Sequence, residues 1–189
     1  MKLSPTFVLA LLCAILVKAL PANTTVSEGS DDNEEKIPVP CPDFQRAIPL
    51  FRAGNPQLRN HFYTTDYNEF WYMVMERKYL NDGYAGRLYD THDRYTVPVY
   101  RLYNQWTYDH FYTTSEWERD DYISSRGYQY ERVAGYILPS DICSGIPLFR
   151  LISRAKTHFY TTNPKERYEA VTYQGYAYEG ILGYVQEMR

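Results

Sequence analysis

Three segments of the chain alternate apolar and polar residues in the same way. Each begins with an aliphatic-Pro-aliphatic-aromatic-Arg stretch, which predicts a short strand with proline near its start, where no ladder hydrogen bond is needed. A polar turn follows, and then the stretch His-Phe-Tyr-Thr-Thr, whose residues favour strands. The first stretches are 48–52, 97–101 and 146–150, and the second are 61–65, 110–114 and 158–162. Each pair therefore predicts a β-hairpin.

A helix is predicted directly after each hairpin. Asp66, Ser115 and Asn163 stand at the N-cap position, and a glutamate follows each of them three residues later, as in a capping box. The glutamates are Glu69, Glu118 and Glu166. Gly127 and Gly175 suit the left-handed position that follows a helix. Tyrosine-rich segments then predict two further strands, so each repeat is expected to run strand–strand–helix–strand–strand.

The fixed spacing of the His-Phe-Tyr-Thr-Thr stretch is typical of a repeat architecture. We expect repeats at about 46–94, 95–143 and 144–189. Four short strands cannot bury two faces alone, so the copies should share one core. We predict a mainly β fold with short helices, whose three repeats close around a pseudo-threefold axis. The helix in each repeat favours a three-bladed propeller-like arrangement over a β-trefoil-like one.

The first 40 residues differ from the rest of the chain. Lys2, the apolar run 7–17 and the small residues near Ala19 predict a signal peptide over 1–19. The polar, acidic residues 20–40 predict a disordered leader, and Asn23-Thr24-Thr25 is a glycosylation sequon. A single repeat domain is then expected over 41–189, in a secreted, extracellular protein.

The cysteines indicate the compartment of the protein, and its net charge restricts the classes of partner that we expect. Cys13 lies in the predicted signal, which leaves Cys41 and Cys143 as an even pair that predicts a disulfide in an oxidising compartment. The net charge is −3, and removal of Lys2 and Lys18 with the signal makes it about −5. This acidity disfavours nucleic acid and anionic membranes, which need clustered cations. We expect a monomer.

The repeated histidines suggest two readings. His61, His110 and His158 could converge on a metal, as three-histidine sites do, or could each make the same structural hydrogen bond. We predict no metal site, because no carboxylate recurs beside them. No GxSxG or HExxH motif is present, and the recurring glutamates already serve as helix caps. The sequence therefore predicts no catalytic residue and no cofactor.

The aromatic content points to binding. The chain has 21 tyrosines, eight phenylalanines and three tryptophans, and Tyr and Trp pair a flat apolar face with a polar group, which suits stacking on sugar rings. We expect Phe62, Phe111 and Phe159 in the core. The candidate ligand-binding residues are Arg52, His61, Tyr63, Arg101, Trp106, Asp109, His110, Tyr112, Arg150, His158 and Tyr160. Alternatively, the arginines pair with helix glutamates as scaffold and many tyrosines only join strands.

The chain also resembles a known family. Its Pro-aliphatic-aromatic-Arg strands, the stretch 109–114, the Glu-Arg pairs at 118–119 and 166–167 and the Tyr-rich close at 178–184 are similar to DUF5648, secreted tandem repeats of unknown function. The resemblance covers about 46–187. Members occur as arrays of three and are often joined to secreted hydrolases, which implies a carbohydrate-binding module. A protein-interaction or effector module is the alternative, and a small secreted hydrolase is a third.

Overall fold

The structure is a computed structural model that describes residues 41–188. The signal peptide predicted over 1–19, the leader over 20–40 and the sequon at Asn23 lie outside the described residues. No helix in the described part of the chain is long and apolar enough to cross a membrane.

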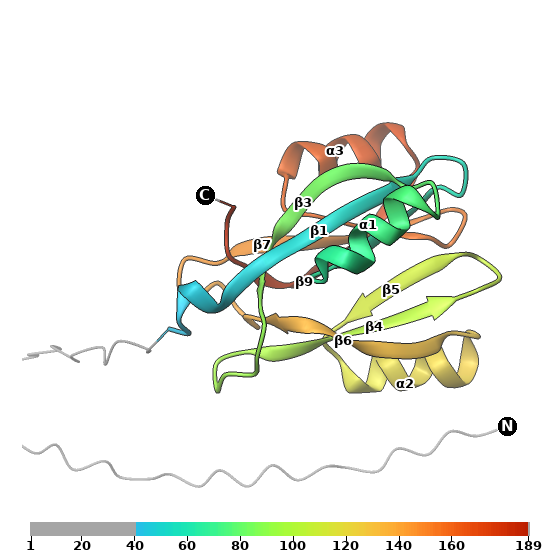
Figure 1. Ribbon diagram of the computed structural model, residues 1–189. Coiled ribbons are helices and arrows are strands. Elements are labelled where there is room, and N and C mark those ends of the chain that lie inside the picture. The colour runs from blue at the N-terminus through green and yellow to red at the C-terminus, as the bar shows by residue number, and fades with distance from the viewer. Residues whose placement is uncertain (1–40, 189) are drawn as a thin grey trace, which may run out of the picture. The chain divides into compact units, whose positions relative to one another are not determined.

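The described residues follow one order of elements three times (Figure 1). Repeat 1 contains β1 (Ala47–Asn55), β2 (Asn60–Thr64), α1 (Tyr67–Met75) and β3 (Leu80–Tyr89). Repeat 2 contains β4 (Val97–Asn104), β5 (Asp109–Thr113), α2 (Glu116–Ser125) and β6 (Gln129–Ile137). Repeat 3 contains β7 (Ile146–Ser153), β8 (His158–Thr161), α3 (Pro164–Tyr173) and β9 (Tyr176–Val185). A 3-10 turn, η1 (Phe44–Arg46), precedes β1. The prediction of a mainly β chain with short helices is confirmed.

The prediction of two strands after each helix was wrong, because β3, β6 and β9 are single long strands. In repeat 2 the pairing of β4 with β6 shifts register between Val99 and Tyr100, and again between Arg101 and Leu102. Such shifts mark bulges, which bend a strand without ending it. Gly135 lies within β6 at φ 155°, a conformation that favours glycine. The two segments that were expected as separate strands after α2 are therefore parts of one bent strand.

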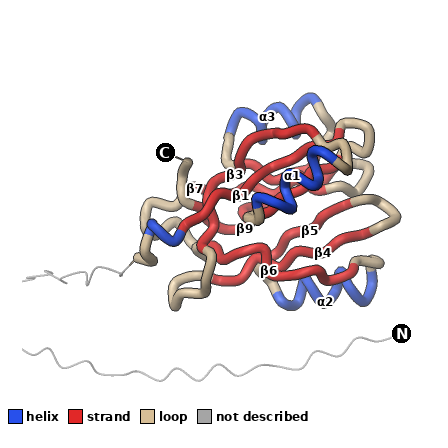
Figure 2. The backbone as a smooth tube through the Cα atoms, in the orientation of Figure 1, coloured by secondary structure: helices blue, strands red, loops and turns tan. Residues whose placement is uncertain are grey.

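Each repeat forms a three-stranded antiparallel set with its first strand in the middle (Figure 2). The sets of repeats 1 and 2 join through the pair Tyr89↔Tyr136 into a six-stranded sheet, which curls as a half-barrel. The set β8-β7-β9 is a separate sheet. It meets the others through the bridges Arg87↔Gln186 and Leu138↔Tyr184.

Helix starts and ends follow local sequence, as predicted. The side chains of Asp66, Ser115 and Asn163 accept hydrogen bonds from backbone N–H groups of the first helical turns. Gly127 and Gly175 have φ of 73° and 77° after α2 and α3. Lys78 adopts a similar φ of 61° after α1, so the left-handed residue is kept where the glycine is missing.

The three repeats share a core built around a ring of tyrosines. Tyr63, Tyr112 and Tyr160 are at most 3% exposed. The hydroxyl of Tyr63 donates to the carbonyl of Tyr160 (2.7 Å), that of Tyr160 to Tyr112 (3.0 Å), and that of Tyr112 to Tyr63 (2.6 Å). Each hydroxyl also accepts the N–H of the residue to which it donates, at 2.8 Å. Every repeat is thus tied to both others by buried, satisfied polar groups.

Glycines allow the repeats to approach each other closely at three related positions, Gly86, Gly135 and Gly183. A Cβ on Gly183 would lie 2.9 Å from Ile137 Cδ1 and from the carbonyl oxygen of Leu138, which is closer than real Cβ atoms come. These glycines are required by the packing of one repeat on the next, which explains their regular spacing.

The predicted disulfide between Cys41 and Cys143 is confirmed. Its Cα atoms lie 5.6 Å apart, and the two cysteines are 102 positions apart in the chain. It ties the segment before β1 to the segment before β7. A loop of this length is worth about 4.7 kcal/mol in the chain-entropy model.

Candidate functional site

The predicted site residues lie at three interfaces, where each repeat meets the next. We call them interface 1–2, interface 2–3 and interface 3–1, after the repeats that they join. At each one, a β-hairpin of one repeat packs against the hairpin and helix of another. The interfaces contain the same kinds of residue. Where one of them has a different residue at a matching position, the comparison shows how that residue changes the interface.

An arginine and a glutamate join the repeats at every interface. Arg101 donates two hydrogen bonds to Glu69 at 2.7 and 2.9 Å. The same forked pairs are Arg52 with Glu166 and Arg150 with Glu118. Burial opposes the charge of Arg101, but its hydrogen bonds to Glu69 and the nearby negative charges of Glu69 and Glu131 outweigh this effect and raise the pKa of Arg101. Such bidentate pairs are among the stronger polar contacts in proteins.

These pairs correct the role that was expected of the glutamates. Instead of returning to the N-cap, the carboxylate of Glu118 accepts from the hydroxyl of Thr113 (2.5 Å) and from Arg150. Burial raises the pKa of Glu118, but the hydrogen bonds with Arg150 and Thr113 lower it by a larger amount. The pKa of Glu118 is therefore below its ordinary value. Pairing of the arginines with helix glutamates was the alternative that the sequence offered, and it is confirmed, but the sequence could not reveal that each arginine comes from another repeat.

The histidines lie at three separate interfaces. His61 packs on Phe159 with ring centroids 4.6 Å apart, His110 on Phe62 at 4.9 Å, and His158 on Phe111 at 4.7 Å. No group of three or more His, Cys, Asp or Glu side chains suited to a metal occurs among residues 41–188. The phenylalanines are buried, as predicted.

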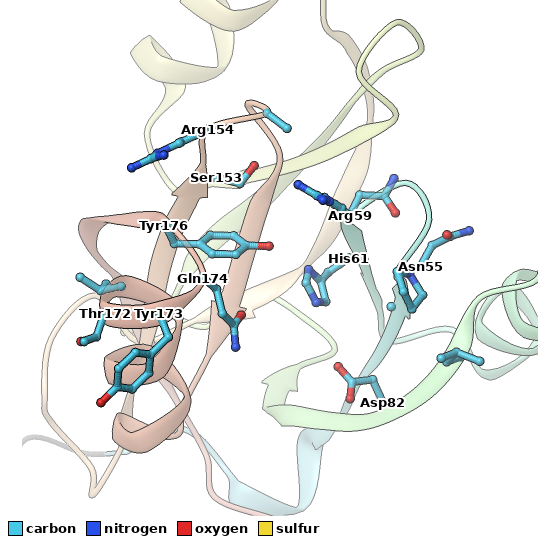
Figure 3. A pocket seen from close by; sticks show the side chains of 17 residues that line it. Asn55, Arg59, His61, Asp82, Ser153, Arg154, Thr172, Tyr173, Gln174 and Tyr176 are labelled. Atoms are coloured by element: carbon cyan, nitrogen blue, oxygen red, sulfur yellow. The ribbon is translucent and has the colours of Figure 1, made fainter.

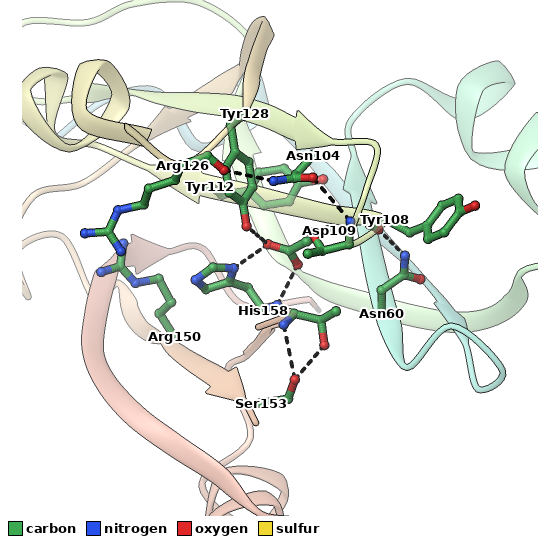
Figure 4. Close-up of polar contacts among 12 residues, drawn as sticks. Asn60, Asn104, Tyr108, Asp109, Tyr112, Arg126, Tyr128, Arg150, Ser153 and His158 are labelled. Carbon is green, nitrogen blue, oxygen red and sulfur yellow. Dashed lines mark hydrogen bonds and ion pairs between the residues drawn. The ribbon is translucent and has the colours of Figure 1, made fainter. Parts of the chain in front are cut away.

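One position differs among the repeats and changes what its interface does. In repeat 2 it is Asp109, whose carboxylate accepts from the backbone N–H of His158 and contacts its ring Nδ1, both at 2.6 Å (Figure 4). Tyr128 also donates to this carboxylate, at 2.8 Å. Asp109 and His158 are 0% and 1% exposed. Interface 2–3 is therefore closed by a buried polar network.

The other two interfaces lack this network. Thr157 stands at the matching position of repeat 3 and donates to the carbonyl of Arg59 at 2.6 Å. Asn60 stands there in repeat 1 and donates to the carbonyl of Tyr108. Neither side chain reaches an imidazole, so Nδ1 of His61 and of His110 is buried without a hydrogen-bond partner.

Both unpartnered histidines are held in the neutral form. Burial is the main cause, and nearby arginines act in the same direction. Together they lower the pKa of His61 to about 4, with Arg52 contributing, and the pKa of His110 to about 3, with Arg101 contributing. A neutral imidazole offers one donor and one acceptor.

Interface 3–1 opens into a cleft of about 850 Å³, which we call cleft A (Figure 3). Figure 3 shows side chains of repeats 1 and 3 facing each other across it, with the ring of Tyr176 directed toward His61. The polar and aromatic lining residues include Asn55, Arg59, His61, Asp82, Ser153, Arg154, Tyr173, Gln174 and Tyr176.

A glycine makes cleft A wide. Gly54 pairs with His61 across the hairpin, where Tyr103 pairs with His110 and Ile152 with His158. A Cβ on Gly54 would lie 3.5 Å from Cδ2 and 3.8 Å from Nε2 of His61, which is ordinary contact. A larger side chain there would cover the imidazole, so the missing side chain opens this edge of the ring.

Interface 1–2 holds a smaller cleft of about 550 Å³, cleft B. The ring of Tyr103 lies 4.6 Å from His110 and covers it. The lining is rich in tyrosine and also includes the charged residues Glu76, Arg77 and Glu131.

The predicted ligand-binding residues fall into distinct environments. Of the eleven, His61 lines cleft A and His110 lines cleft B. The tyrosines and arginines among them make the inter-repeat contacts described above, Asp109 and His158 form the closed network, and Trp106 is 79% exposed in the β4–β5 turn. Ligand contact by these other residues stays a prediction.

Most of the cleft A lining was missed by sequence reasoning. Arg59 and Arg154 lie in the β1–β2 and β7–β8 turns, and Tyr173 lies at the end of α3. These residues do not recur at matching positions, and recurrence was the main signal. The only feature of the sequence that pointed to cleft A was an arginine in each of these two hairpin turns.

The fold and its shared interfaces define a mainly β domain assembled from three similar units. Comparison with known families shows that the chain belongs to a domain family of unknown function, DUF5648, whose model matches residues 49–186. No curated protein and no solved structure matches the chain.

Proposed function

We propose that this chain is a non-catalytic recognition module that binds carbohydrate in cleft A. The observation that carries the proposal is a cleft of about 850 Å³ that combines tyrosine rings with several hydrogen-bonding side chains. Sugar rings present an apolar face bordered by hydroxyl groups. Tyrosine offers a matching apolar face with a polar end, and a cleft of this size falls in the range of small-ligand sites.

His61 gives cleft A a neutral hydrogen-bonding group. Burial lowers its pKa to about 4, so the ring is uncharged at neutral pH. A neutral imidazole has one donor and one acceptor nitrogen. Nε2 lies at the ring edge beside Gly54, and in either tautomer it can form a hydrogen bond with a sugar hydroxyl, which both donates and accepts.

We further propose that the three repeats close around a pseudo-threefold axis as a propeller-like ring. The tyrosine hydrogen bonds and the arginine–glutamate pairs support this, because each runs from repeat 1 to repeat 2, to repeat 3 and back to repeat 1. A closed ring leaves fewer open sheet edges. It would also hold the two walls of cleft A rigidly, which lowers the entropy cost of binding.

The module is proposed to act outside the cell, as a monomer. The Cys41–Cys143 disulfide supports export, since such bonds persist in oxidising compartments.

The test of the carbohydrate proposal uses Gly54. Calorimetric titration with a panel of soluble cell-wall oligosaccharides should find a ligand for the purified chain. Gly54→Tyr should weaken its binding by about tenfold or more, because the new ring would cover His61 as Tyr103 covers His110.

Gly54→Ala is the matched control and should bind almost normally, since its Cβ meets only ordinary contacts. The thermal midpoints of both variants should stay near that of the parent. Absence of binding to every oligosaccharide, or binding that Gly54→Tyr leaves unchanged, would sink the proposal.

A protein-interaction module is the second candidate, and exposed aromatic residues on the helices favour it. Trp117 on α2 is 77% exposed, and Tyr67 and Met75 on α1 are 59% and 62% exposed. Aromatic residues and methionine are enriched in protein interfaces. Binding to an extracellular protein that is lost in Trp117→Ala, but kept in Gly54→Tyr, would select this function.

A further inference from the structure

Cleft A carries positive charge on its rim that no carboxylate among residues 41–188 neutralises. Arg59 and Arg154 line the cleft from opposite repeats, and both are exposed. Neither guanidinium forms an ion pair with any of the residues described. Most other arginines at the interfaces are engaged, as Arg52 is with Glu166 and Asp82. The two free arginines are therefore available to a ligand.

Both arginines lie beside other residues that line the cleft. Burial raises the pKa of Tyr176, whereas the positive charge of Arg59 lowers it, so this guanidinium is within electrostatic reach of the ring. A Cβ on Gly175 would lie 3.7 Å from Nε of Arg154, which puts Arg154 beside the turn between α3 and β9. Tyr176 and Gly175 themselves line cleft A.

One acidic side chain, Asp82, is part of the lining. It lies 2.8 Å from Nε of Arg52, which is buried and also pairs with Glu166. This group of one arginine and two carboxylates therefore has a net charge of about −1, and neutral His61 adds none. Arg59 and Arg154 outweigh it, so cleft A is a net positive site on a chain whose net charge is −3.

Cleft B shows the opposite balance. Its charged lining residues are Glu76, Arg77 and Glu131. The interfaces share their arginine–glutamate pairs, so the difference comes from residues of the turns and helix ends. Positive charge is a property of cleft A and not of every inter-repeat cleft.

We propose that cleft A selects carbohydrate that carries carboxylate groups, with Arg59 and Arg154 binding the carboxylates while Tyr173 and Tyr176 contact the sugar rings. The inference rests on the proposed function and adds the class of sugar. The planar guanidinium fits a carboxylate through two parallel hydrogen bonds. Because the arginines stand on opposite walls, they suit an acidic unit that spans the cleft.

The experiment compares two forms of one ligand. Oligogalacturonate and its fully methyl-esterified form have the same sugar backbone and length, but only the first is charged. Calorimetric titration of the full chain at low salt should show at least tenfold tighter binding of the acid form. The preference should shrink at high salt, since screening weakens exposed charge pairs.

Two arginine variants locate the effect. Arg59→Gln and Arg154→Gln should each weaken binding of the acid form severalfold and leave binding of the ester unchanged. Lys165→Gln on α3 removes the same charge from a side chain that is 81% exposed and outside the lining, and it should change neither affinity.

The outcomes separate this inference from the proposed function. Equal binding of both forms, tighter binding of the ester, or an equal effect of Lys165→Gln would overturn the preference for carboxylates and leave carbohydrate binding intact. If neither the acid form nor the ester binds, and no neutral oligosaccharide binds, the proposed function would be overturned as well.

Discussion

Interfaces 2–3 and 3–1 are built from the same parts but end in different states. Both contain an arginine–glutamate fork, a histidine packed on phenylalanine and a tyrosine at or directly before the start of the last strand. At interface 2–3, Asp109 binds both the backbone and the ring of His158. At interface 3–1, Thr157 binds the backbone of Arg59 but not an imidazole, and the ring of His61 faces a cleft.

One side chain thus determines whether the repeated histidine is hydrogen-bonded inside a closed interface or faces a cleft. A carboxylate is long enough to accept from a backbone N–H and a ring nitrogen together, whereas a threonine hydroxyl is too short. A second difference adds to it, because Gly54 leaves open the space that Ile152 fills beside His158. The shared parts hold the fold, and the departures from them create the candidate site.

Loss of the carboxylate at interface 2–3 should have the largest effect. Asp109→Ala leaves the N–H of His158, its ring and the hydroxyl of Tyr128 without their acceptor. A buried donor left without its acceptor costs about 1–3 kcal/mol, so the loss of an acceptor shared by several donors should lower the free energy of unfolding by several kcal/mol. Urea denaturation with the disulfide intact measures the loss.

Thr157→Val is the matched change at interface 3–1. It removes the hydrogen bond to the carbonyl of Arg59 and the one shared with the hydroxyl of Ser153, so the free energy of unfolding should fall by only about 1–2 kcal/mol. Equal losses in the two variants would show that the interfaces are equally dependent on this position.

Acidification should weaken the fold through the unpartnered histidines. His110 has a pKa of about 3 when folded, and an ordinary value near 6.5 when unfolded. The unfolded chain therefore binds the proton first, so the stability from neutral His110 is complete above pH 6.5. It is then lost progressively as the pH falls toward 3.

The expected slope is about 1 kcal/mol per pH unit below 6.5 for this histidine. The glutamates of the forks contribute in a lower range, because their pKa values are depressed below 4.5 and their stabilisation is lost only as the pH falls further. Urea midpoints between pH 7 and 4.5 should therefore fall less steeply in His110→Asn than in the parent chain. Parallel slopes would contradict a buried neutral His110.

The smallest change should convert one interface toward the other. In Thr157→Asp, the new carboxylate should reach the ring of His61 as Asp109 reaches that of His158. A nearby negative charge favours the protonated imidazole, so the pKa of His61 should rise from about 4 by about one unit or more. NMR titration of the His61 ring protons measures it, and an unchanged pKa would mean that the two interfaces differ in backbone geometry as well.

Local features of the fold were predictable because they depend on neighbours in the chain. Alternating residues predicted the hairpins, and Asp66, Ser115 and Asn163 marked the helix starts. The single long strands were missed, because a bulge bends a strand without ending it, and bulges arise from the pairing with the partner strand. That partner is not visible in a local pattern.

The sequence by itself determined the repeated hairpins, the capped helices, the buried phenylalanines and the pairing of Cys41 with Cys143. Local propensity, the spacing of apolar residues and an even number of cysteines are features of the sequence that do not depend on which segments pack together. The contacts of the repeated arginines, tyrosines and glutamates with one another across repeats depend on how the repeats pack. The same packing brings Arg59, Arg154 and Tyr176 to one cleft. These residues are distant along the chain and do not recur, so their common site exists only once packing has brought repeats 1 and 3 together.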